Sequence, residues 1–158
     1  MILTEKETTF LKDFKSQEQL CIDKYNKYST QACNQGLKDL FSTIEKTEQQ
    51  HLDSVTQMMS GTVPNVNSSN KEQGGQSTTA DSMLTSSKAA YNEQDKKEDT
   101  FLCQDALANE KHVSSVYNTG IFEFKNEDMR QVLNHIQKEE QHHGKMIYDY
   151  MSQNGMYN

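Results

Sequence analysis

The sequence repeats itself at a distance of 92 residues, and this repeat constrains the fold more than any other feature. A shift of 92 places Ile44-x-x-x-Glu48-x-x-His51 on Ile136-x-x-x-Glu140-x-x-His143. The same shift, without a gap, pairs further like residues: Glu18 with Glu110, Tyr25 with Tyr117, Asn34 with Asn126, Lys38 with Arg130, and Met59-Ser60 with Met151-Ser152. One constant offset over so many polar positions predicts two structurally equivalent halves.

Each half contains two segments in which apolar residues recur at steps of three and four. Such steps keep residues on one stripe of a helix, which is the surface that faces the core of a bundle. The four stripes run from Leu11 to Ala32, Leu37 to Met58, Cys103 to Phe124 and Met129 to Tyr150. All the Glu and His residues of the repeat lie on these stripes, so the pattern predicts four helices with polar residues inside the bundle.

The segments between the stripes predict how the helices are connected. Asn34-Gln35-Gly36 and the stretch 125–128 are turn sequences at equivalent places, so each half is predicted to be a helical hairpin. We expect one domain over residues 1–158, with hairpin one at 1–60, a crossover linker at 61–94 and hairpin two at 95–158. The linker is rich in Gly, Ser, Asn and Thr and is long enough to run the length of the bundle. Residues 81–94 suit either a short helix or an early start of the third long helix.

The expected fold is all-α, an antiparallel four-helix bundle with one long crossover, which is the ferritin-like topology. Four carboxylates inside such a bundle would be very costly without compensating positive charge. Two divalent cations balance four glutamates, and two neutral imidazoles complete the ligand set. The predicted metal ligands are Glu18, Glu48, His51, Glu110, Glu140 and His143. One Glu from each of two helices and Glu-x-x-His from each of the other two is the ligand set of di-iron and di-manganese bundles, with the single glutamates available to bridge the ions.

The fourth helix offers a second pair with the same spacing, Glu139 and His142. Both the offset and the apolar stripe select Glu140 and His143 instead. His112 and His135 match no position of the predicted ligand set, and we expect them at the surface. The alternative for the whole set is four glutamates and two histidines on solvated faces, against which their place within apolar stripes argues.

Tyr25 and Tyr117 lie seven residues after Glu18 and Glu110, on the same helix faces. They fit either a layer of aromatic core residues or hydroxyl donors that hold a ligating carboxylate. The three cysteines form no C-x-x-C pair, which argues against a thiolate metal site. Cys21 and Cys103 lie on apolar faces and are predicted to be small buried residues.

Composition excludes several classes of protein. Asp and Glu number 23 against 16 Lys and Arg, which argues against a nucleic-acid-binding protein. No apolar run approaches the length of a membrane span, and the first residues do not resemble a secretory signal. The sequence therefore predicts a soluble protein made in the cytoplasm.

The paired Glu-x-x-His helices resemble the ferritin-like superfamily, in particular its rubrerythrin and manganese-catalase branch. The chain departs from rubrerythrins because it has no cysteine-ligated iron domain. It also has Leu107 and Val113 where a further Glu would stand one turn from Glu110. This difference argues against a reductant-fed peroxidase.

A second resemblance is to the spore coat protein F family, which is found in spore-forming Firmicutes. It is carried by Leu3-Thr4-Glu5-Lys6-Glu7, Tyr25-Asn26, Met129-Arg130-Gln131-Val132-Leu133 and the ending Tyr150-Met151-Ser152-Gln153-Asn154-Gly155-Met156-Tyr157. The resemblance implies a spore coat location, with other coat proteins or further copies of the chain as partners. Two functions stay open: a dinuclear iron or manganese centre that reacts with peroxide or oxygen, and a structural coat protein in which metal only stabilises the bundle or is absent.

Overall fold

The computed structural model describes residues 2–66 and 89–157, and these residues form four long helices. The helices are α1 (Glu5–Gln31), α2 (Gln35–Met59), α5 (Glu93–Ile121) and α6 (Glu127–Gln153). No strand forms within the described residues. The predicted all-α class and both predicted hairpins are confirmed.

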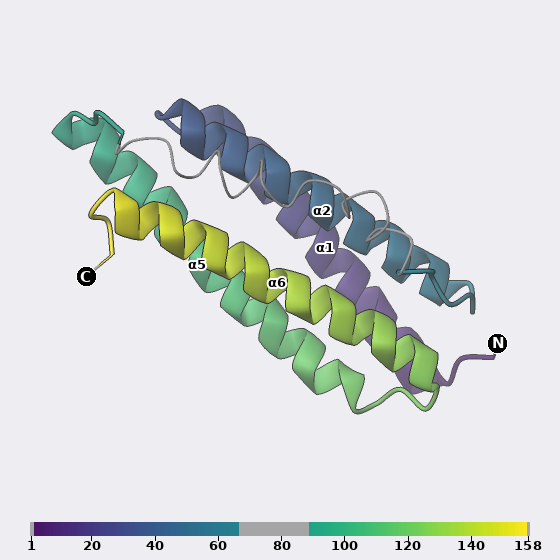
Figure 1. Cartoon of the computed structure of the whole chain (residues 1–158). Coiled ribbons are helices and arrows are strands. Elements are labelled where there is room, and N and C mark those ends of the chain that lie inside the picture. Colours follow the sequence, from purple (N-terminus) through teal and green to yellow (C-terminus); the bar gives the residue numbers. More distant parts are fainter. Residues whose placement is uncertain (1, 67–88, 158) are drawn as a thin grey trace.

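Figure 1 shows the two hairpins lying along each other, with α1 beside α2 and α5 beside α6. Across the bundle, α2 faces α6 and α1 faces α5. Helix α2 ends and α5 begins at opposite ends of the bundle, so the two run in the same direction. This arrangement requires the long crossover predicted for residues 61–94. Helix α5 begins at Glu93, and 89–92 are not helical, while the alternatives for 81–88 lie outside the described residues.

Asparagine side chains begin three of the four helices. Asn34, Asn92 and Asn126 each accept a hydrogen bond from a backbone N–H in the first turn of α2, α5 and α6. Thr4 begins α1 and forms a capping box with Glu7. Asn34 and Asn126 are one of the pairs matched by the 92-residue offset. The two turns are therefore equivalent in their helix caps as well as in their place in the repeat.

The repeat extends to a pair of buried acidic residues that the sequence pattern did not single out. Asp99 accepts hydrogen bonds from the backbone N–H groups of Cys33 and Asn34, at 2.7 and 3.0 Å. Glu7 accepts one from the N–H of Lys125 at 3.0 Å. Glu7 and Asp99 are 92 residues apart, as are Cys33 and Lys125. Each hairpin therefore anchors the turn of the other.

The core consists of two apolar clusters, one toward each end of the bundle. One contains Phe14, Val55 and Leu133, and the other contains Phe41, Leu102 and Ile147. The buried glutamates and histidines lie on the same helix stripes between these clusters. No helix among the described residues is long and apolar enough to span a membrane.

Candidate metal centre

All six predicted ligands are buried and lie together at the middle of the bundle. Glu18, Glu48, His51, Glu110, Glu140 and His143 are each at most 3% exposed. They form two groups in which one potential ligand atom from each residue lies within 4.8 Å of the others. The first group contains Glu18, Glu48, His51 and Glu140, and the second contains Glu48, Glu110, Glu140 and His143.

The two imidazoles turn the same nitrogen toward the carboxylates. Nδ1 of His51 lies 3.2 Å from both Glu48 and Glu140, and 3.6 Å from Glu18. Nδ1 of His143 lies 3.3 Å from Glu48 and 3.6 Å from both Glu110 and Glu140. Carboxylate oxygen and imidazole nitrogen are the ligands that iron and manganese sites of this kind use.

The glutamates of the two Glu-x-x-His motifs lie between the two imidazoles. Glu48 directs Oε2 toward His51 and Oε1 toward His143, and Glu140 directs Oε1 toward His51 and Oε2 toward His143. Only these two residues belong to both groups. Glu18 belongs to the His51 group alone and Glu110 to the His143 group alone. Each glutamate of a Glu-x-x-His motif therefore faces both imidazoles, whereas each single glutamate faces one of them.

Tyr25 and Tyr117 are buried core residues whose hydroxyls also donate to the cluster. Tyr25 of α1 donates to Oε1 of Glu110 on α5, and Tyr117 of α5 donates to Oε1 of Glu18 on α1. Each tyrosine thus holds the glutamate of the neighbouring helix rather than the one on its own helix. Because one oxygen of each carboxylate is held in this way, its second oxygen is left facing the centre.

Several buried polar atoms of this cluster have no hydrogen bond. They are Oε2 of Glu18, Oε1 of Glu48, Oε2 of Glu110, both carboxylate oxygens of Glu140 and Nδ1 of His143. Among the described residues, every buried side-chain nitrogen or oxygen in this condition belongs to the cluster. Buried polar atoms are normally hydrogen-bonded, so a group of exceptions calls for a partner such as an ion.

The histidines and the two central glutamates perturb each other strongly without metal. Burial alone lowers the pKa of His51 and of His143, but the surrounding carboxylates outweigh it and raise both pKa values well above the usual 6.5. Burial raises the pKa of Glu48 and Glu140, but the close approach of the two imidazoles outweighs it and lowers both pKa values. In the metal-free bundle these shifts favour the cationic imidazoles and the ionised forms of Glu48 and Glu140.

The two outer glutamates behave in the opposite way. Burial raises the pKa of Glu18 to about 8, and it raises the pKa of Glu110 well above its usual value. These shifts favour the protonated form of both carboxyls in the metal-free bundle. Protons on these carboxyls and on the imidazoles would be released when two divalent cations bind.

The burial of side chains on α6 agrees with the predicted register, but Glu139 also contacts the cluster. His142 is exposed, whereas Glu140 and His143 are buried. Glu139 is half-buried, and its Oε2 lies 2.7 Å from Nε2 of His51. The same oxygen lies 3.3 Å from Nε2 of His135. His135 was expected at the surface, but it is half-buried. The hydrogen bond from His51 outweighs burial and lowers the pKa of Glu139.

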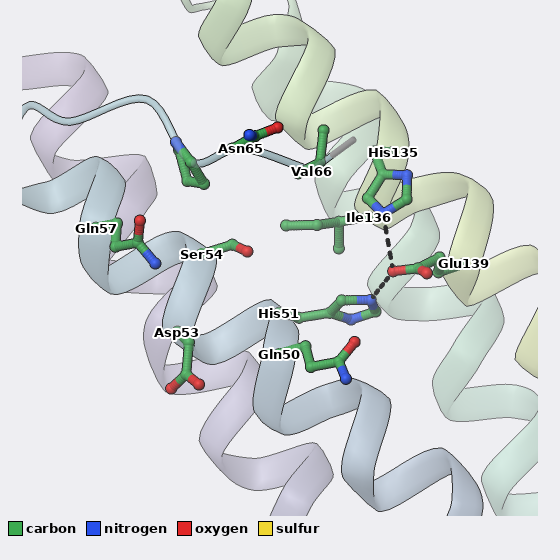
Figure 2. Close-up of a pocket in the computed structure, with 11 residues that line it drawn as sticks. Gln50, His51, Asp53, Ser54, Gln57, Asn65, Val66, His135, Ile136 and Glu139 are labelled. Atoms are coloured by element: carbon green, nitrogen blue, oxygen red, sulfur yellow. Dashed lines mark hydrogen bonds and ion pairs between the residues drawn. The ribbon is translucent and has the colours of Figure 1, made fainter. Parts of the chain in front are cut away.

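A pocket of about 180 Å³ reaches the centre from the His51 side. Figure 2 shows it between α2, α6 and the segment 64–66, with His51, Glu139 and His135 joined in a row. This segment lies in the predicted crossover linker, whose contact with the centre the sequence did not indicate. The pocket is large enough for water, which needs roughly 10–15 Å³ of such space. Because His51 lines it, this pocket offers an approach to the centre.

The predictions for the remaining residues are mostly confirmed. Cys21 and Cys103 are fully buried, and burial raises the pKa of the Cys103 thiol to about 12. Cys33 is exposed at the α1–α2 turn, where burial of its thiol and the nearby carboxylates raise its pKa to about 11. His112 is exposed, as expected.

Comparison with known families identifies the second half of the chain. The Coat F domain model matches residues 98–158, which span most of α5, all of α6 and the C-terminal residues. The predicted resemblance to the Coat F family is confirmed over this stretch. A search of the curated proteins found no match, and a search of the solved structures found none either. The matched residues supply Glu110, Glu140 and His143, and the other half of the cluster comes from residues 1–97.

Proposed function

We propose that the bundle binds two divalent metal ions, iron or manganese, in the cluster at its middle. The observation that carries this proposal is the set of buried ligand atoms without hydrogen bonds, which within residues 2–66 and 89–157 is confined to the cluster. A core of this polarity is costly unless charge and hydrogen-bonding capacity are met. Two ions would meet both, because they balance four carboxylates.

Each ion would have its own imidazole and its own outer glutamate. His51 and Glu18 would hold one ion, His143 and Glu110 the other, and Glu48 and Glu140 would bridge them. Tyr25 and Tyr117 would fix the outer carboxylates from the opposite helix. The residues present thus fit a dinuclear site without any further ligand from the chain.

We also propose that the protein is a component of the spore coat. The Coat F match supports this location over the matched half of the chain. Its partners there would be other coat proteins or further copies of the same chain. In the alternative form of this proposal, the centre has no redox role and metal serves only to hold the two hairpins together.

Metal content tests the centre itself. After loading with Fe(II) or Mn(II) and removal of excess metal, elemental analysis should find about two ions per chain. Glu140→Ala and His143→Ala should lower this content strongly, because each removes a ligand. His142→Ala is the matched control, since His142 is exposed on the same helix and should leave the content unchanged. A stable bundle that retains almost no metal would contradict the proposed site.

Reactivity separates the redox role from the structural one. Iron or manganese at such a centre supplies electrons to peroxide or oxygen, and a pair of ions can engage one small oxidant together. The chain provides buried ligands, fixed outer carboxylates and an approach from the pocket beside His51. Gly120 and Gly144 leave no further room beside the centre, because Phe14 fills the space at Gly120 and Leu107 packs against Gly144.

Stopped-flow absorption would decide between the two roles. The di-ferrous protein is mixed with peroxide, and we expect oxidation of the iron within seconds. The control is the same experiment with Glu48→Ala, which lacks one of the two bridging carboxylates and should lose the fast phase. A fully loaded protein that shows no oxidation on this timescale would favour the structural coat role.

A further inference from the structure

We propose that Glu139 is a positioning residue for His51 that makes the two metal positions unequal, so that the position beside His51 fills first. This inference rests on the proposed metal site. It goes beyond that site because the ligand set alone treats the two positions as equivalent. Three observations support it: a hydrogen bond, its absence at the equivalent place and the position of the pocket.

The first observation is how the His51 ring is held. Its Nδ1 faces the carboxylates and its Nε2 lies 2.7 Å from Oε2 of Glu139. A ligating Nδ1 must offer its lone pair, so Nε2 must carry the ring proton. Glu139 accepts that proton in a hydrogen bond and so favours the tautomer and the ring orientation that a metal needs. His135 contacts the same oxygen at 3.3 Å and holds the carboxylate in turn (Figure 2).

The second observation is that His143 lacks this support. The residue 92 positions before Glu139 is Thr47, which is half-buried and directly precedes Glu48 as Glu139 precedes Glu140. Thr47 carries no carboxylate. Among the described residues, the carboxylates that contact His143 are Glu48, Glu110 and Glu140, and all three do so through Nδ1. The pseudo-symmetry of the repeat is therefore broken at this one contact.

The third observation is that the pocket lies on the supported side. Its lining includes His51, His135 and Glu139, together with Pro64, Asn65 and Val66 of the segment after α2. His143 and Glu110 do not line it. An ion that arrives through this pocket reaches the His51 position first, where the ring is already oriented.

The test follows the two imidazoles separately during a titration with Zn(II) alone. The full chain, with ¹⁵N-labelled histidine, is titrated without other metals, and the signals are assigned with His51→Gln and His143→Gln. In the wild-type chain we expect the His51 signal to shift during the first equivalent and the His143 signal during the second. Glu139→Ala should weaken binding at the His51 position about 10- to 100-fold, as loss of such partners typically does, and should abolish the order.

Two further variants distinguish positioning from general damage to the fold. Glu139→Gln keeps an accepting oxygen without the charge, so its loss of affinity should be smaller than that of Glu139→Ala. Thr47→Glu places a carboxylate at the equivalent position, and it should tighten the second step and bring the two His signals closer together. This gain cannot arise from unfolding.

The outcomes that overturn the inference are separate from those that overturn the metal site. Simultaneous shifts of both signals in the wild-type chain, or an unchanged order in Glu139→Ala, would overturn the role of Glu139 while two ions still bind. No binding of Zn(II) to the wild-type chain would overturn the metal site and this inference with it.

Discussion

At the residue scale, the two halves of the repeat exchange large and small core residues at equivalent positions on α1 and α5. Phe14 is fully buried and packs where Gly120 leaves room on α5. At the equivalent positions, 92 residues away in each case, stand Ala106 and Tyr28. Tyr28 packs against the core cluster that contains Ala106, so the large residue of each pair lies on α1. The stripe pattern marks all four positions as core but does not indicate that their sizes are linked.

Gly120→Ala should destabilise the bundle, although alanine favours helices. A Cβ at this position would clash with Cζ of Phe14, and that ring is stacked on Tyr117 with centroids 4.5 Å apart. Overpacking of this kind costs about 1–3 kcal/mol. The helix-propensity gain is only about 1 kcal/mol. Urea unfolding of the metal-free protein measures the difference.

Gly144→Ala is the matched control for this prediction. Its added Cβ would meet Leu107 at 3.7 Å, an ordinary contact. The propensity gain should then prevail, so this variant should be more stable than wild type by up to about 1 kcal/mol. The same sign for both glycines would show that packing at Phe14 does not decide the outcome.

At the element scale, the helix ends are joined through buried acids rather than through the loops alone. Asp99 lies on α5 yet satisfies two N–H groups of the α1–α2 turn, and Tyr91 donates to it at 2.6 Å. Glu7 of α1 accepts a hydrogen bond from one N–H group of the other turn, that of Lys125. These bonds fix the relative height of the two hairpins. That height sets which Glu and His residues meet at the centre.

Asp99→Ala should therefore loosen the α1–α2 turn. Two backbone N–H groups and one hydroxyl would lose their acceptor, and each buried group left unsatisfied costs about 1–3 kcal/mol. We expect a loss of at least about 2 kcal/mol in unfolding free energy. Faster amide hydrogen exchange should appear at Cys33 and Asn34. Asp128→Ala, at an exposed position, should change stability by less than about 1 kcal/mol, and equal losses in both variants would contradict the anchoring role.

At the scale of the whole molecule, the sequence predicts what depends on periodicity. The offset and the steps of three and four place Glu18, Glu48, Glu110 and Glu140 at one height, and the structure agrees. The spacing of residues along one helix does not predict which side chains of the facing helix they contact. The stripe places Tyr25 near Glu18, but its hydroxyl reaches Glu110 on the helix opposite.

Glu139 shows the same limit more clearly. It lies one position off the stripe, where a helical residue normally faces outward. His51 and Glu139 are 88 residues apart in sequence, and their contact depends on the direction of both side chains. Its neighbour His135, four residues earlier on α6, was a signal in the sequence, because an i, i+4 pair of this kind shares one helix face.

The whole-molecule prediction concerns pH. In the metal-free protein the pKa of Glu18 is about 8 instead of 4.5, and the pKa values of Glu110, His51 and His143 are also raised. The folded state therefore binds more protons than the unfolded state between about pH 5 and 8, and stability falls as pH rises. Glu48 and Glu140 have lowered pKa values, so their contribution is fully present above 4.5 and is lost only in acid. Glu48 and Glu140 therefore do not offset the loss of stability between pH 5 and 8.

The melting temperature of the metal-free chain should thus decrease from pH 5 to pH 8, measured by circular dichroism with chelator present. A Glu18→Gln, Glu110→Gln double variant imitates the two protonated carboxyls and should show a weaker decrease. Mn(II) should reverse the trend, because binding displaces up to four protons and becomes tighter as pH rises. A melting temperature that is flat across this range without metal, or equally steep in the double variant, would show that protons do not hold the place of the ions.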